Sequence, residues 1–210
     1  GVTSHDCVSL VRRITGEKSI GHLGTLDPMA TGALPLLLGK YTRLAQFLGQ
    51  AEKQYTGTIQ FGYATDTFDA EGVPATEARP LTLSLDQLQE LAKRFHGPID
   101  QVPPVFSAKK INGVPAYKLA RAGADVPVKP ARIFIHAFDL LSLEGTAVSF
   151  AMTVSAGGYV RSVAHELGTL AGCGAHLASL RRTRAGAFTV EQAMTAENLK
   201  VMDGNPAEVE

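Results

Sequence analysis

A single carboxylate stands among glycines near the start of the chain, in a pattern suited to covalent or acid–base chemistry. Residues 21–32 read Gly-His-Leu-Gly-Thr-Leu-Asp-Pro-Met-Ala-Thr-Gly, with Asp27 as the acidic residue and His22 as the histidine. Glycine lets the backbone pass where a side chain would clash, and the residue before a proline is pushed out of the helical region. Asp27 is therefore predicted in a turn or an extended segment, with the little neighbouring bulk that a nucleophile or base on a large substrate requires. The alternative is an Asp-Pro turn that only joins two elements.

Two further side chains could act together with this carboxylate. Tyr55 opens a stretch of alternating residues that predicts a strand over residues 55–61, where the alternative role of the ring is packing. Arg161 follows a pair of glycines at the start of a predicted helix. From there its guanidinium could pair with Asp27 and hold that carboxylate ionised, whereas the alternative is an arginine in solvent.

Composition and charge narrow the class of protein. The 210 residues are 45% hydrophobic and carry a formal net charge of zero, which fits a globular domain with a real core and predicts no polyanionic partner from overall charge. Basic residues nevertheless cluster, so one basic face is expected, unless these charges are scattered and solvated. The clusters are Arg12-Arg13, Lys109-Lys110, Lys118 with Arg121, and Arg181-Arg182 with Arg184.

Several common kinds of site are missing from the sequence. Cys7 and Cys173 lack metal-ligand spacing and are expected as free thiols in a reducing compartment. There is no Gly-x-x-x-x-Gly-Lys-[Ser/Thr] phosphate loop and no Gly-x-Ser-x-Gly nucleophile elbow. Neither a signal peptide nor an apolar run long enough to span a bilayer is recognisable. We therefore expect a cytoplasmic protein with no metal site and no membrane contact.

The rest of the pattern predicts the elements that must position these residues. Ser4 is the expected cap of the first helix, and Ser84 with Gln87 forms a capping-box pattern at a second helix. Residues 99–105 contain prolines and cannot form an inner strand. The strands and helices mix without a βαβ rhythm, so the expected fold class is α+β, with a mixed, mostly antiparallel sheet flanked by helices and loops. Helices are expected over residues 4–13, 42–48, 81–95, 115–122, 159–170 and 175–180, and strands over 55–61, 133–143, 147–155 and 188–190.

Five motifs, taken in order along the chain, resemble those of the TruB-type tRNA pseudouridine synthases. The resemblance covers residues 1–190, and five motifs in sequence are far more specific than one alone. Gly158 and Glu166 depart from the family's usual Thr and Asp, and neither change removes a catalytic group. The motifs lie within residues 21–32, 53–72, 101–121, 157–168 and 174–188.

This resemblance implies a pseudouridine synthase catalytic fold and the isomerisation of uridine to pseudouridine in the T-loop, at position 55 of tRNA. The implied mechanism uses base flipping and an aspartate nucleophile, with attack at C1′, attack at C6 and a glycal route all left open. Asp27, Tyr55 and Arg161 are the expected catalytic residues: the nucleophile, a ring that stacks on the uracil, and the partner of the nucleophile. No metal and no cofactor is implied. The expected substrate- and RNA-binding residues are His22, Gly24, Thr25, Lys109, Lys110, Arg121, Tyr159, Leu180 and Arg181.

The resemblance also implies a domain plan and a partner. Residues 1–190 are expected to form the catalytic domain, with residues 103–121 as a thumb-like insertion that contacts RNA. Residues 191–210 are expected as a tail, too short for the family's usual C-terminal RNA-binding domain. The implied partner is the T-arm stem-loop of tRNA, with no obligatory protein partner, and a monomer is expected.

Three alternatives stay open at this point. One is a non-catalytic RNA-binding or tRNA-folding module, and another is the catalytic subunit of a guide-RNA pseudouridylation particle. The third is a glycosidase that uses Asp66 and Asp69 as paired carboxylates. Acidic residues three positions apart in a polar turn also suit solvated caps.

Overall fold

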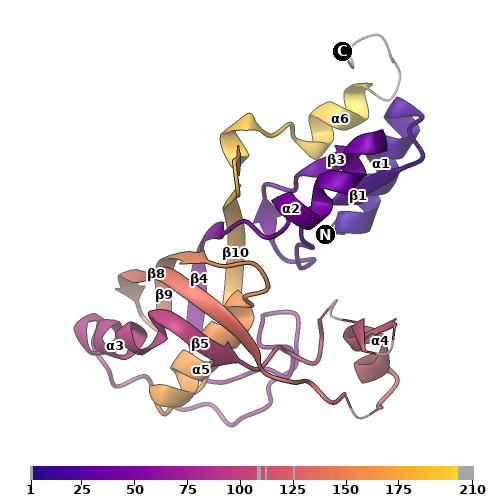
Figure 1. Ribbon diagram of the computed structural model, residues 1–210. Coiled ribbons are helices and arrows are strands. Elements are labelled where there is room, and N and C mark those ends of the chain that lie inside the picture. Colours follow the sequence, from indigo (N-terminus) through magenta and orange to yellow (C-terminus); the bar gives the residue numbers. More distant parts are fainter. Residues whose placement is uncertain (1, 108–109, 112, 125, 203–210) are drawn as a thin grey trace. The chain divides into compact units, whose positions relative to one another are not determined.

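The computed structural model describes residues 2–107, 110–111, 113–124 and 126–202 (Figure 1). The chain forms two compact units, one built from Gly1–Lys53 with Arg181–Glu210 and the other from Gln54–Leu180. Helices accompany a mixed sheet whose observed pairings are mostly antiparallel, which confirms the α+β class. Among the helices of these described residues, none is long and apolar enough to cross a membrane.

In the first unit, helix α1 (Ser4–Thr15) has its N-cap one residue before the expected one. Thr3 is the N-cap: its side chain accepts a hydrogen bond from the Asp6 N–H, and the Asp6 carboxylate accepts one from the Thr3 N–H at 2.9 Å. The prediction that Ser4 caps this helix is therefore wrong, because Thr3 and Asp6 together satisfy the exposed backbone groups. The Ser4 hydroxyl instead contacts Leu26, far along the chain.

Short strands frame the glycine-rich segment of this unit. Strand β1 (Ile20–His22) pairs antiparallel with β3 (Leu36–Leu38). Between them in sequence, β2 (Thr31–Gly32) pairs in parallel with Arg181 and Arg182 of β10 (Ala175–Ala185). The glycine-rich segment therefore pairs with β3 at its start and with β10 at its end. The other elements of the unit are η1 (Gly39–Leu44), α2 (Ala45–Leu48), β11 (Phe188–Thr189), η3 (Val190–Gln192) and α6 (Ala196–Met202).

The second unit is organised around strands in the order β10-β4-β9-β8-β5. The hairpin predicted over residues 133–155 is confirmed, because β8 and β9 pair antiparallel up to the turn after Glu144. Strand β5 stands at the end of the order, where Pro98 is tolerated although it has no N–H to donate. The strands are β4 (Lys53–Phe61), β5 (Gly97–Gln101), β8 (Ala131–Glu144) and β9 (Ala147–Val154).

Two helices pack with this sheet (Figure 1). Helix α3 (Leu85–Ala92) contacts β8 and also α5 (Val160–Leu170). Its start confirms the predicted capping box, since Ser84 and Gln87 exchange side-chain-to-backbone hydrogen bonds. The 3-10 turn η2 (Lys93–Phe95) follows it, and β6 (Lys110–Ile111), β7 (Val114–Pro115) and α4 (Ala116–Arg121) lie later in the chain. The core of the unit includes Ile59, Phe61, Leu88, Phe138, Phe150, Leu167 and Leu177.

Residues 175–180 form the first half of β10 and not the helix that we expected. The stretch is rich in alanine and leucine, which favour helices, and Leu177 and Leu180 have helical spacing. Gly174, at φ 76°, turns the chain after α5, and its N–H donates to the Gly168 carbonyl at 3.0 Å. The strand then takes its place beside β4, and pairing within the sheet overrides the local helix preference.

Candidate active site

The predicted turn at Asp27 is present in the first unit. The Asp27 carbonyl accepts a hydrogen bond from the Ala30 N–H at 2.9 Å, which closes a four-residue turn. Aspartate suits the first position of such a turn and Pro28, with its fixed φ, suits the second. Asp27 is half-buried. The turn and the catalytic roles considered for this residue are therefore compatible, because the turn is made by the backbone and leaves the carboxylate for other partners.

Both ends of the loop are fastened to β10 through Arg182. Arg182 is 1% exposed, and its guanidinium group donates from Nε to the Ala33 carbonyl at 2.8 Å and from Nη2 to the Gly24 carbonyl at 3.1 Å. The Arg182 carbonyl accepts from the Ala33 N–H at 2.8 Å. Gly32, at φ 105°, comes so close that a Cβ atom there would lie 2.1 Å from the same carbonyl oxygen. One arginine thus closes the loop that carries Asp27.

A second buried cation lies beside this arginine. The Lys53 ammonium donates to the carbonyls of Gly49 and Ala51, at 3.1 and 2.8 Å. Burial, and then the charge of Arg182, lower the pKa of Lys53. A Cβ atom on Gly24 would lie 3.5 Å from both the Lys53 Cε and the Arg182 Nη1. The positive charges of Lys53 and Arg182 therefore lie next to the loop, and backbone carbonyls accept hydrogen bonds from both side chains.

His22, at the start of the same loop, is held in its neutral form. Burial lowers its pKa first, and the charges of Arg182 and His5 lower it further. Its Nδ1 is buried and makes no hydrogen bond to the residues that the structure describes. A neutral imidazole here suits packing against a nucleotide better than pairing with a phosphate.

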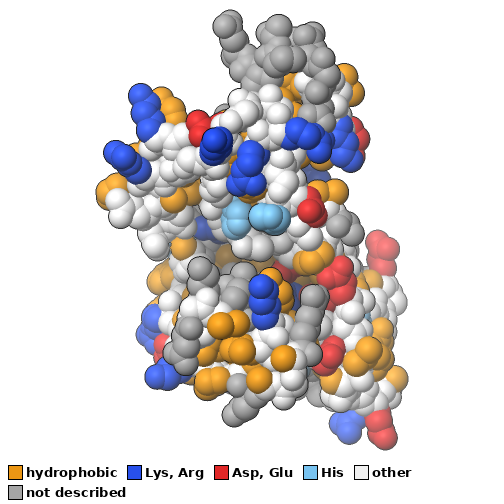
Figure 2. Space-filling view, turned by 90° about the vertical axis from the view of Figure 1, so that its right-hand side faces the viewer, with side chains coloured by type: hydrophobic (Ala, Val, Ile, Leu, Met, Phe, Trp, Pro, Cys, Tyr) orange, Lys and Arg blue, Asp and Glu red, His pale blue; other side chains and the backbone are white. Residues whose placement is uncertain are grey.

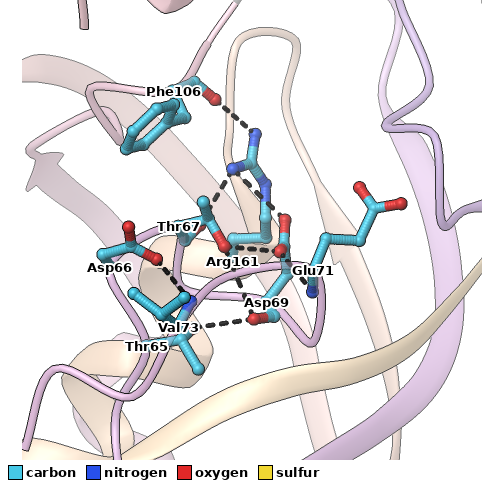
Figure 3. A network of polar contacts seen from close by, with 8 residues as sticks. All are labelled: Thr65, Asp66, Thr67, Asp69, Glu71, Val73, Phe106 and Arg161. Atoms are coloured by element: carbon cyan, nitrogen blue, oxygen red, sulfur yellow. Dashed lines mark hydrogen bonds and ion pairs between the residues drawn. The ribbon is translucent and has the colours of Figure 1, made fainter. Parts of the chain in front are cut away.

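In the second unit, Arg161 is the centre of a buried polar network (Figure 3). It lies in the first turn of α5 and is 4% exposed, so the alternative of an arginine in solvent is wrong. Its Nη1 lies 3.5 Å from the Asp69 Oδ2 and donates to the Thr67 carbonyl at 3.0 Å. Its Nη2 donates to the Phe106 carbonyl at 3.0 Å. The pairing of Arg161 with Asp27 stays a prediction.

Asp69 is itself fixed by its neighbours. Its Oδ1 accepts from the Thr67 hydroxyl at 2.6 Å and from the Glu71 N–H at 3.0 Å. Asp66 is exposed and its Oδ1 accepts from the Val73 N–H at 2.9 Å. The two carboxylates therefore have separate structural partners, and the glycosidase alternative loses its support. This turn lies within the second motif, at residues 53–72, but the sequence gives no sign that Asp69 contacts Arg161.

The turn that carries Asp69 contains one unfavourable backbone conformation and is held in place by contacts with α5 and β10. Phe68 adopts φ 65°, which is unfavourable for a residue with a side chain. Its ring stacks on the His165 ring from α5, with centroids 3.8 Å apart and planes at 17°. Burial lowers the pKa of His165, so this stack contains a neutral imidazole. Two backbone hydrogen bonds with Leu177 of β10 also hold the turn in place.

The start of α5 is tied to the segment after β5. The Gln101 side chain is 3% exposed and pairs with the backbone of Tyr159, accepting from its N–H at 2.7 Å and donating to its carbonyl at 3.0 Å. One turn later, the Ser162 hydroxyl donates to the Val102 carbonyl at 3.0 Å. The first turn of α5, which carries Arg161, is therefore anchored to Gln101 and Val102, a connection that the sequence did not show.

The other predicted residues are distributed over both units. Tyr55 on β4 and Leu180 on β10 are buried in the second unit. Gly24, Thr25 and Arg181 are exposed in the first unit, where the Arg181 Nη1 donates to the Thr31 hydroxyl at 3.4 Å. Lys109 lies outside the described residues, while Lys110 is in β6 and Arg121 ends α4.

The distribution of charged side chains on the surface can be compared with the predicted basic face. Figure 2 shows Lys and Arg side chains at several places on one face, and Asp and Glu side chains on the same face. A polyanion would thus meet local basic patches rather than a uniformly positive surface, in keeping with the zero net charge.

The chain is similar to known proteins over nearly its whole length. Residues 12–160 match the family described as TruB family pseudouridylate synthase (N terminal domain), and residues 161–205 match the tRNA pseudouridylate synthase B C-terminal domain. The proteins named tRNA pseudouridine synthase B from Solibacter usitatus and Geotalea uraniireducens are 46% and 44% identical to it. These alignments cover 95% and 99% of this chain and 68% of each relative.

The fold has a solved counterpart. A chain in the crystal structure of a Cbf5-Nop10-Gar1 complex is 32% identical and superimposes with a TM-score of 0.68 over 90% of this chain. The alignment covers 47% of the solved chain, so the present chain spans about half of its length.

Proposed function

This chain belongs to the TruB family of pseudouridylate synthases, and on that premise we propose that it isomerises uridine to pseudouridine in the T-loop of tRNA, at position 55. The observation that carries the proposal is the turn at Asp27, a half-buried carboxylate on a loop fastened at both ends by Arg182. A carboxylate on a loop that is held at both ends suits attack on a nucleotide.

The reaction sets the demands on the site. The N1–C1′ bond must break, the uracil must rotate, and a new bond must form between C5 and C1′, while C5 loses a proton and N1 takes one up. Asp27 can begin this by attack at C1′, by attack at C6, or by removal of the C2′ proton on a glycal route. The target base lies in a folded loop and must first be flipped out, which costs a few kcal/mol, less than in a duplex.

Arg161 then acts as the partner of Asp27. A guanidinium carries five N–H donors in a planar fork, so it can hold Asp69 and a second carboxylate together. Support comes from the contacts that hold Arg161 in a single orientation, namely Asp69 and the carbonyls of Thr67 and Phe106. A preorganised cation of this kind keeps the nucleophile ionised and aimed.

The remaining residues bind the RNA. Tyr55 stacks on the flipped uracil, an interaction worth roughly 1–3 kcal/mol for an aromatic ring, and its hydroxyl takes part in removal of the C5 proton. Leu180 packs under the base and excludes water, which limits hydrolysis of the cleaved intermediate. Lysines and arginines of residues 103–121 contact phosphates of the T-arm, so binding weakens as salt increases.

The test is tritium release from a T-arm hairpin that carries 5-tritiated uridine. We expect release by the wild-type protein and none by the Asp27→Asn variant, which keeps the shape of the side chain but not its charge. Binding of the hairpin, followed by fluorescence anisotropy, should be nearly equal for the two proteins. Equal loss of binding and turnover in the variant would make Asp27 a structural residue instead.

The same assay separates the alternatives. Release from a bare hairpin by this protein alone, with neither a further protein nor a guide RNA added, would argue against the catalytic subunit of a guide-RNA particle. That alternative is worth testing because a similar chain was solved in a Cbf5-Nop10-Gar1 complex. Tight binding without release by either protein would favour an RNA-binding or tRNA-folding module.

A further inference from the structure

We propose that Ser4 is a positioning residue for this reaction, because its hydroxyl fixes the peptide group that precedes Asp27. The proposal rests on the proposed function, in which Asp27 is the nucleophile. It concerns a residue whose hydroxyl acts through the backbone of residue 26.

Ser4 is not needed where a serine at the start of a helix usually acts. Thr3 and Asp6 form the capping box of α1, with hydrogen bonds of 2.9 and 3.2 Å between their side chains and backbone N–H groups. Ser4 is the first residue inside the helix and is 6% exposed. A buried hydroxyl needs a partner, and here the partner is not in the helix.

The hydroxyl of Ser4 contacts both backbone polar groups of Leu26. It accepts a hydrogen bond from the Leu26 N–H at 2.9 Å and lies 3.3 Å from the Leu26 carbonyl, to which it donates. That carbonyl belongs to the peptide bond between Leu26 and Asp27. Because the peptide group is planar, holding its oxygen also holds the nitrogen and the Cα of Asp27.

The hydroxyl completes a three-point support for the loop. Arg182 holds the loop at Gly24 and Ala33, on either side of Asp27. The bond from the Ala30 N–H to the Asp27 carbonyl fixes the turn that follows. Without the Ser4 hydroxyl, the segment between Gly24 and Asp27 would lose these two hydrogen bonds to α1, and the Leu26 N–H would lose this acceptor. The direction of the nucleophile is therefore set from a helix, a strand and a turn.

The expected consequence is a loss of rate with little loss of affinity. A misplacement of about 1 Å at a reacting group can reduce the rate about 100-fold, while contacts elsewhere on the RNA are unaffected. We expect Ser4→Ala to lower the single-turnover rate constant by about 10- to 100-fold and to leave the Kd for the hairpin unchanged within about 2-fold.

Thr3→Ala is the matched control. It removes the neighbouring hydroxyl and the N-cap, a change that usually destabilises a protein by about 0.5–2 kcal/mol, but Thr3 makes no hydrogen bond to Leu26. Both variants are assayed well below their melting temperatures. The rate constant should fall in Ser4→Ala and stay at the wild-type value in Thr3→Ala.

Two further variants make the test independent of stability. Ser4→Thr keeps a hydroxyl and should retain most of the rate. Ser4→Cys has nearly the same shape as serine but hydrogen-bonds weakly, so it should be slow. A wild-type rate in Ser4→Ala or Ser4→Cys, or an equal fall in Ser4→Ala and Thr3→Ala, would overturn the proposal. An inactive wild-type protein would instead overturn the proposed function itself.

Discussion

The buried pair of Arg161 and Asp69 makes a prediction that can be worked out from the structure. The two side chains are 4% and 5% exposed, and Arg161 Nη1 lies 3.5 Å from Asp69 Oδ2. Removing one partner of a buried ion pair leaves the other charge uncompensated, at a cost of about 3–5 kcal/mol. In Asp69→Asn the remaining side-chain oxygen can still accept from Thr67 and Glu71, so we expect the lower end, about 3 kcal/mol of unfolding free energy.

In Asp69→Asn, we expect turnover to fall as well as stability. Arg161 would keep its bonds to the Thr67 and Phe106 carbonyls but would lose the buried carboxylate of Asp69, and its position would become less fixed. We expect tritium release from the hairpin to slow by about 10- to 100-fold at temperatures where the variant is folded. Urea unfolding at pH 7.5 gives the first quantity and the release assay gives the second.

Asp66→Asn is the control for this prediction. It removes the same charge three residues away, from an exposed side chain whose Oδ1 accepts from the Val73 N–H at 2.9 Å, as an asparagine oxygen also can. Its unfolding free energy should change by no more than about 0.5 kcal/mol. If Asp69→Asn behaved like Asp66→Asn in both measurements, the ion pair would contribute to neither stability nor catalysis, and the reasoning would be refuted.

Three other changes test separate parts of the structure. Gly32→Ala should destabilise the protein and abolish turnover, because its Cβ would lie 2.1 Å from the Arg182 carbonyl oxygen at φ 105°; unaltered thermal melting would contradict that close approach. Burial lowers the pKa of His22 and His165, so the folded protein binds these protons less tightly than the unfolded chain, whose histidines titrate near pH 6.5. Stability should therefore fall as the pH drops from 7.5 to 5.5, and a His22→Gln, His165→Gln double variant should show a smaller fall in urea unfolding; an equal fall would exclude these histidines. Tyr55→Phe should keep its affinity for the hairpin but release tritium more slowly, and a wild-type rate would limit Tyr55 to stacking.

The elements that the sequence predicts correctly are those set by contacts between residues close in sequence. The capping box of Ser84 and Gln87 is complete within four residues, and the hairpin of β8 and β9 needs only alternation and a turn. The Asp-Pro turn at Asp27 is likewise set by the residues within it. Each of these predictions depended on chemistry between near neighbours.

The failures concern contacts between residues that are distant in sequence. Ser4 and Thr3 both suit an N-cap, and only the long-range bond to Leu26 shows why Ser4 is placed inside the helix. The helix predicted over residues 175–180 gave way to a strand because a neighbouring strand was available. The contact between Arg161 and Asp69 could not be predicted from the sequence either, since Asp69 was grouped with Asp66 in one polar turn.

The junction between Gln101 and Tyr159 anchors residues 101–106 to the start of α5. Four hydrogen bonds join residues 101–106 to the first turn of α5: two from the Gln101 side chain, one from Ser162 and one from Arg161. At about 0.5–1.5 kcal/mol net each, breaking all four would cost roughly 2–6 kcal/mol. Because one of these bonds comes from Arg161, displacing residues 101–106 from α5 would also remove a contact that orients its guanidinium. In the proposed function, the base of the segment that contacts RNA is therefore anchored to the helix that carries the partner of Asp27.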